Sequence, residues 1–125
     1  MVFAPEIGGK DDGLLEVREI RSLRLKASLV TLSACNTGVG PVGAVDVADL
    51  GNAFIEAGAE SVVSTLWELE DQSTMQLMTN FYQNLSAHQT KANALRAAQL
   101  GLMRAGLPLY YWASFQVVGD PSGTL

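Results

Sequence analysis

The sequence predicts an α/β fold built on a small, mostly parallel sheet. Short apolar runs that favour strands alternate with longer segments whose apolar residues recur at helical spacing. Two of these runs, residues 28–34 and 61–67, are nearly continuous, as is typical of strands covered on both faces in a parallel sheet. With 125 residues, of which 48% are hydrophobic and 17% charged, the chain suits one compact domain with its own core.

The N-terminal half is expected to place two helices and a buried strand between loops, after a short edge strand. The bounds in chain order are edge strand 2–4, glycine-rich loop 8–13, helix 14–23, strand 28–34, loop 36–43 and helix 46–58. Asp46 can cap the last of these helices, because its carboxylate can accept a hydrogen bond from a free backbone N–H. Gly58 can end the same helix, because glycine tolerates the left-handed backbone that often follows a helix.

The C-terminal half is expected to contain a second buried strand, two helices and a closing strand. The bounds are strand 61–67, helix 72–85, helix 91–104 and strand 112–118. The apolar stripes of the two helices are Met75, Met78, Phe81, Tyr82 and Leu85 in the first, and Leu95, Ala98 and Leu102 in the second. Thr90 can cap the second helix, Pro108 interrupts the chain after it, and Gly119 stops the closing strand.

Composition and charge argue against several classes of partner. The net charge of −5 disfavours nucleic acid, because binding to a phosphate backbone needs a basic surface. No apolar run approaches the roughly 18 residues needed to cross a bilayer, and the N-terminus lacks the pattern of a signal peptide. Cys35 is the single cysteine, so one chain has neither a disulfide framework nor a thiolate metal cage. A free thiol fits a reducing, cytoplasmic setting.

Cys35 ends the first buried strand and opens the loop that leads to helix 46–58. In open α/β sheets, reactive groups gather at the carboxyl ends of the strands, and a nearby helix N-terminus lowers the pKa of a thiol. This position suits a nucleophile. Free cysteine is also a small hydrophobe that is frequently buried, so position alone favours a structural thiol.

Five segments together carry a family signal. They are residues 12–20 (DGLLEVREI), 29–38 (LVTLSACNTG), 58–67 (GAESVVSTLW), 91–99 (KANALRAAQ) and 110–121 (YYWASFQVVGDP). Taken in order, they resemble CHAT domains, a caspase-like group related to separases, over nearly the whole chain. The resemblance implies a caspase-like three-layer sandwich and a cysteine peptidase activity. It also implies that Cys35 is the nucleophile and that its backbone N–H helps to form an oxyanion hole.

A peptidase of this kind needs a histidine to take the thiol proton and to protonate the leaving amine. In caspases that histidine lies about 50 residues before the cysteine, but only 34 residues precede Cys35 and none is histidine. The CHAT family carries its histidine on an earlier strand, so the chain is expected to be the C-terminal part of the domain, truncated at the N-terminal side. The single histidine, His88, lies between two expected helices and is interpreted as a solvated loop residue.

The resemblance implies a longer parent protein, because CHAT domains commonly follow tetratricopeptide-type helical repeats. The parent would be a cysteine endopeptidase acting on protein or peptide substrates, and the isolated chain would be inactive. The alternative is a non-catalytic interaction module that docks a partner or a second copy through an exposed sheet edge. A sheet that lacks strands leaves backbone groups unpaired, so we expect self-association into a homo-oligomer.

Acidic residues follow the second buried strand, on the same rim as Cys35. Residues 67–71 (WELED) resemble the Trp-acid turn of separases and CHAT domains, in which acidic groups line the pocket for the residue before the cut. Glu68 and Asp71 match those positions, and their carboxylates would favour a basic side chain. Two alternatives stay open: Asp71 can N-cap the helix that starts at residue 72, and Glu68 can simply be solvated together with Glu70.

Four aromatic residues, Trp67, Tyr110, Tyr111 and Trp112, have the chemistry to stack a ligand. Such residues are more often core or interface anchors, so the sequence assigns them no site role. No cofactor or metal site is indicated. The glycine-rich loop 38–43 lacks the Gly-Lys-Ser/Thr ending of a phosphate-binding loop.

Overall fold

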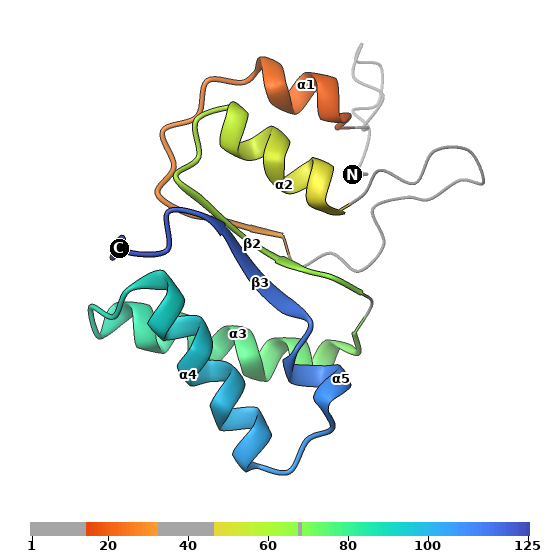
Figure 1. The fold of residues 1–125 in the computed structure, drawn as a ribbon, viewed down its shortest axis with the longest axis vertical. Helices are drawn as coiled ribbons and strands as arrows, with labels where there is room; N and C mark the ends of the chain where they lie inside the picture. Colours follow the sequence, from red (N-terminus) through yellow and green to blue (C-terminus); the bar gives the residue numbers. More distant parts are fainter. Residues whose placement is uncertain (1–14, 33–46, 68) are drawn as a thin grey trace, which may run out of the picture.

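The computed structural model describes residues 15–32, 47–67 and 69–125. Figure 1 shows a small sheet with helices on both sides. In chain order the elements are α1 (Val17–Ser22), β1 (Val30–Leu32), α2 (Val47–Glu56), β2 (Ser61–Thr65), α3 (Asp71–Ser86), α4 (Lys91–Arg104), α5 (Leu109–Trp112) and β3 (Phe115–Gly119). The expected edge strand 2–4 and the loops 8–13 and 36–43 lie outside the described residues.

The three described strands form one sheet in the order β1-β2-β3. β1 and β2 are parallel, with Leu32 opposite Ser64, whereas β2 and β3 are antiparallel, with Thr65 opposite Phe115. The expectation of a mostly parallel sheet therefore fails for the closing strand. The reason is the helical hairpin between β2 and β3: α3 leads the chain away from the end of β2 and α4 brings it back, so β3 must run in the opposite direction (Figure 1).

Helices cover both faces of the sheet, which gives the described residues three layers (Figure 1). Val62 and Val63, adjacent in β2, are both fully buried and point to opposite faces, as the alternation of a strand requires. Val62 packs in a cluster with α1 and α2, which comprises Ile20, Leu32, Leu50, Ala53, Phe54, Ala57, Ala59 and Val62. Val63 packs in a second cluster with α3 and α4, which comprises Val63, Leu69, Leu77, Phe81, Leu85, Ala94, Leu95, Ala98, Leu102 and Phe115.

Gly58 ends the turn after α2 with a φ of 109°, which confirms the expected glycine stop. The turn is also crowded, because a Cβ at this position would collide with the backbone carbonyl of Leu25. The backbone N–H of Leu25 donates to the Ala57 carbonyl at 2.7 Å. The segment after α1 is therefore held directly against the end of α2.

The helices of the C-terminal half agree with the sequence in α4 and differ from it in α3. In α4, Thr90 caps the first turn by accepting a hydrogen bond from the Asn93 N–H, and the three predicted core residues are buried. In α3, Phe81 and Leu85 of the predicted stripe are buried, and Ser73 and Leu77 complete the buried face. Met75 is 66% exposed, although the sequence placed it in the apolar stripe. The buried face of α3 therefore includes Leu77 in place of Met75.

The expected closing strand 112–118 begins later than predicted. Residues 109–112 form the short helix α5, whose N-cap is Pro108, and the strand starts only at Phe115. Proline suits the start of a helix because its φ is already helical and its missing N–H would have had no partner there. The aromatic residues Tyr110, Tyr111 and Trp112, which favour strands by propensity, therefore lie in or at the end of a helical turn.

The C-terminal segment folds back onto the start of α4. The backbone N–H groups of Lys91 and Ala92 donate to the carbonyls of Gly123 and Pro121, both at 3.1 Å. These bonds satisfy donors that a helix N-terminus otherwise leaves without a partner. The side chain of Lys91 is fully buried beneath this segment, with Nζ 3.5 Å from Glu60 Oε2. None of the helices that the structure describes is both long and apolar enough to cross a bilayer.

Candidate functional site

The predicted site residues come, in the sequence, directly after the ends of the parallel strands β1 and β2. Leu32, the last residue of β1, lies opposite Ser64, one residue before β2 ends at Thr65. Both strands therefore end at the same edge, which is where α/β proteins place their binding groups. Cys35 and Glu68 each follow the end of their strand by three residues in sequence. Both lie outside the described residues.

Asp71 is the described member of the predicted acidic pair, and it is exposed as the first residue of α3. The N-cap of this helix is Glu70, so the alternative interpretation of Asp71 as the cap is wrong by one residue. The Glu70 side chain makes no capping bond. Its backbone carbonyl instead accepts a hydrogen bond from Ser73 Oγ at 3.1 Å. A carboxylate in the first helical turn is stabilised by the positive end of the helix dipole, and Asp71 presents its carboxylate to solvent there.

An aromatic contact that the sequence did not assign to the site holds the end of β2 against α5. The indole Nε1 of Trp67 donates to the backbone carbonyl of Tyr110 at 2.9 Å. The two rings lie 5.7 Å apart between centroids at an interplanar angle of 30°. Tyr110 in turn meets Tyr111 edge to face, with centroids 5.6 Å apart. No local sequence signal predicts this arrangement, because it joins residues more than forty positions apart.

A side-chain hydrogen bond joins β1 to α3. Thr31 Oγ1 and the Tyr82 hydroxyl lie 2.7 Å apart. Thr31 is the middle residue of β1, one position before its end. The hydroxyl pair therefore holds β1, the strand that precedes Cys35 in the sequence, against α3.

The comparison with known families decides the classification of this chain. A model of the CHAT domain matches residues 1–120. The chain belongs to the CHAT family. It is also 28% identical over 110 residues to tetratricopeptide repeat protein 28 of Mus musculus, an alignment that covers 86% of this chain and 4% of that protein. This CHAT chain therefore spans about 4% of the length of the curated relative that it matches.

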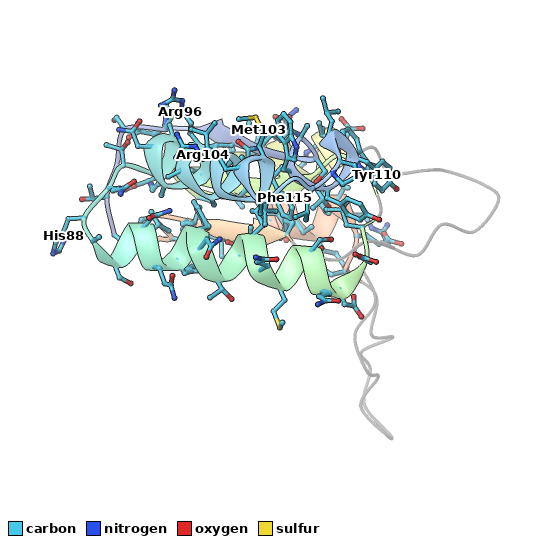
Figure 2. The ribbon with its side chains drawn as sticks, turned by 90° about the horizontal axis from the view of Figure 1, so that it is seen from below. His88, Arg96, Met103, Arg104, Tyr110 and Phe115 are labelled. Carbon is cyan, nitrogen blue, oxygen red and sulfur yellow. The ribbon has the colours of Figure 1, made fainter. Side chains whose placement is uncertain are left out.

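His88 of this CHAT chain is exposed in the turn between α3 and α4 and has a φ of 60°. Figure 2 shows it at one end of α3, while Tyr110 lies beside the other end. The 16 residues of α3 separate the two ends by roughly 24 Å. His88 is thus a solvated turn residue, as the sequence indicated, and it is out of hydrogen-bond reach of the edge where α3 begins. Among the described residues, no group of three or more His, Cys, Asp or Glu side chains is arranged to hold a metal ion.

Proposed function

We propose that this CHAT chain supplies the nucleophile and the substrate pocket of a caspase-like cysteine endopeptidase. The observation that carries the proposal is the parallel pairing of β1 with β2 in a member of this family. The two strands end at the same edge of the sheet, and Cys35 and Glu68 each follow one of these ends by three residues in the sequence. The helices on both faces support a caspase-like three-layer sandwich as the finer description of the fold.

Cys35 would attack the carbonyl carbon of the scissile peptide bond as a thiolate, forming a C–S bond. The negative charge that develops on the carbonyl oxygen would be stabilised by the backbone N–H of Cys35. The histidine that removed the thiol proton would return it to the leaving amine as the C–N bond breaks. Water would then hydrolyse the thioester and release the acid product with the free thiol.

The substrate would carry a basic residue before the cut. Glu68 and Asp71 follow the end of β2, and Asp71 is exposed at the first turn of α3. The sequence contains no Lys or Arg between Lys26 and Lys91, so the segments that form this rim supply carboxylates without basic neighbours. Charge-assisted hydrogen bonds from a guanidinium or an ammonium would satisfy those carboxylates.

The catalytic histidine would come from a preceding part of a longer parent protein, since none of the 34 residues before Cys35 is histidine. The name of the mouse relative supports a parent with tetratricopeptide repeats. We place the protein in the cytoplasm on the basis of its single free thiol, and we expect peptide or protein substrates.

The test uses this chain and a peptide ketone that carries Arg before the reactive group and alkylates an active-site thiol. We expect the probe to label Cys35 in preference to a matched probe with Glu in place of Arg, and Cys35→Ala to abolish labelling. We expect no turnover of Arg or Lys peptides by the chain alone. Labelling that is equally fast with both probes would contradict the proposed acidic pocket. Turnover by the isolated chain would show that the chain contains a general base of its own.

A second candidate function is a non-catalytic interaction module that self-associates or docks a partner. The position of His88 favours it, since the described residues place no histidine at the edge where β2 ends. Sedimentation velocity over a range of concentrations tests this alternative. A concentration-dependent dimer together with an unreactive Cys35 would support the module, whereas a monomer with selective labelling of Cys35 would support the peptidase.

A further inference from the structure

Large apolar side chains are concentrated on the surface where β2 ends and α5 packs against it. We call this surface the aromatic patch, and it consists of Trp67, Leu109, Tyr110 and Tyr111. Leu109 is 62% exposed and Tyr110 51%. Trp67 and Tyr111 are half-buried and also contact the α3/α4 cluster. Figure 2 shows Tyr110 beside the end of α3 that carries Asp71. Exposed apolar surface of this kind marks interaction sites in soluble proteins.

Hydrogen bonds hold the backbone of the aromatic patch in one geometry. The N–H of Leu66 donates to the Ser114 carbonyl at 2.8 Å, next to the bond from Trp67 Nε1 to the Tyr110 carbonyl. Behind α5, the side-chain amide of Gln99 donates to the carbonyls of Trp112 and Phe115, both at 3.0 Å. These bonds fix both ends of α5. The patch is therefore organised before any ligand arrives, which lowers the entropic cost of binding.

The charge around the aromatic patch limits what can occupy it. The residues that build it contain no charged side chain, and the exposed carboxylates of Glu70, the N-cap of α3, and Asp71, its first residue, lie beside it. The nearest basic residue along the chain is Arg104, which Figure 2 places apart from Tyr110. Phosphate groups, acidic peptides and anionic lipid would be repelled there. A neutral or basic ligand with a large apolar group matches both the surface and its charge.

We propose that the aromatic patch is a second specificity subsite, which binds a large apolar side chain of a peptide close to the basic residue that meets Asp71. This inference rests on the proposed peptidase function for the identity of the ligand. It adds that an aromatic or branched aliphatic residue contributes to recognition and that an acidic residue at the same peptide position is rejected. Tyr110 and Leu109 determine the preference, because they present the most exposed apolar surface of the patch.

The experiment measures binding to the Cys35→Ala chain by NMR, so that it needs no catalysis. The probes are short peptides that contain one Arg, with a Phe, Ser or Asp moved along the flanking positions. The chain contains two tryptophans, Trp67 and Trp112, and Trp112→Phe assigns their two indole N–H signals. We expect the Phe peptide at one position to bind about tenfold more tightly than the Ser peptide and to shift the Trp67 signal. The Asp peptide should bind least.

Two variants and a control complete the test. Leu109→Ala and Tyr110→Ala should each remove the advantage of Phe over Ser, while leaving the binding of the Ser peptide unchanged. Met75→Ala, which truncates a 66% exposed apolar side chain on α3, should leave the advantage intact. Equal binding of the Phe and Ser peptides at every position would overturn the subsite. So would a Trp67 signal that shifts with protein concentration alone, since a second copy of the chain would then cover the patch.

The outcome separates this inference from the proposed function. A preference for Phe that depends on Tyr110, together with a Cys35 that does not react with the Arg probe, would retain the subsite and reject the peptidase. Selective labelling of Cys35 with no effect of Leu109→Ala or Tyr110→Ala would retain the peptidase and reject the subsite.

Discussion

The buried ammonium group of Lys91 lies directly beside Gly123, and the two residues are also joined through the backbone. The Lys91 N–H donates to the Gly123 carbonyl at 3.1 Å. A Cβ at residue 123 would lie 3.0 Å from Lys91 Nζ, which is closer than packed atoms normally approach. A side chain at residue 123 would therefore press against the end of the buried lysine.

The first prediction concerns this close approach. Gly123→Ala should lower the free energy of unfolding by about 1 kcal/mol, because the new methyl group overpacks a site whose neighbour has no free space. Lys91→Met, which keeps a long side chain without the charge, should relieve the conflict in the double variant. Urea denaturation of the single and double variants measures the coupling. A Gly123→Ala chain as stable as the parent would mean that Lys91 can move aside at no cost.

The second prediction concerns acid stability. The hydroxyl and the backbone N–H of Ser122 donate to Asp120 Oδ1 at 2.6 Å and 2.9 Å. These bonds, with a smaller contribution from the charge of Lys91, hold the pKa of Asp120 below the ordinary value of 3.8. A depressed carboxyl pKa stabilises the folded state above the unfolded pKa, and the stabilisation is lost as the pH falls through the folded pKa.

Ser122→Ala should therefore raise the pKa of Asp120 toward its ordinary value and reduce the loss of stability between the two pKa values. NMR titration of the Asp120 carboxyl carbon measures the shift directly. Thr124→Ala, in the same segment but outside this network of hydrogen bonds to Asp120, is the control and should leave the titration unchanged. An Asp120 pKa that does not respond to Ser122→Ala would mean that the Ser122 hydroxyl does not cause the depression, and would leave it to the backbone N–H of residue 122 and the charge of Lys91.

The third prediction compares a glycine inside α2 with the glycine that follows this helix. Among the described residues, no atom lies within 4 Å of a Cβ placed on Gly51, so Gly51→Ala should raise the free energy of unfolding by about 1 kcal/mol through helix propensity. Gly58→Ala should lower it, because Gly58 has a φ of 109° and a Cβ there would collide with the Leu25 carbonyl. Thermal unfolding followed by circular dichroism checks both. Changes of the same sign would contradict the description of this turn.

The fourth prediction concerns Asp71. Asp71→Asn should reduce the rate at which the Arg probe labels Cys35, relative to a neutral thiol reagent, because one carboxylate of the pocket is lost. It should also cost up to about 1 kcal/mol of stability through the helix dipole. Gln72→Ala, the next position on α3, is the control for local effects. If Asp71→Asn slows the neutral reagent equally, Asp71 acts on the reactivity of the thiol and not on the substrate.

The features that the sequence predicted correctly are those decided by neighbouring residues. Thr90 caps α4 and Gly58 ends the turn after α2, because a hydroxyl or a missing side chain at one position suffices. The buried face of α3 was predicted correctly at Phe81 and Leu85 but not at its start, where Leu77 is buried and Met75 is exposed, because packing against the rest of the fold decides which residue faces inward. The direction of β3 could not be predicted either, because it depends on where the hairpin of α3 and α4 returns the chain.

The same difference between local signals and long-range packing applies to the candidate site. Asp71 was expected within one residue of its place at the start of α3, because acidic residues after a strand are a local signal. The contact of Trp67 with Tyr110 was not expected, since it forms only when α5 is brought against the end of β2. Cys35 and Glu68 stay predictions from sequence and from the resemblance to the CHAT family.

The antiparallel return of the chain has a mechanical consequence. The two stretches that make up the aromatic patch lie just before α3 and just after α4. The hairpin of these two helices is therefore connected to both stretches (Figure 1). Tilting the hairpin relative to the sheet would move Trp67 and Tyr110 together, without breaking the hydrogen bond between them. The turn of the hairpin, at His88, lies far from the patch (Figure 2). If peptides bind at the aromatic patch as proposed, a partner that contacts the turn at His88 could reorient Trp67 and Tyr110 without covering the patch.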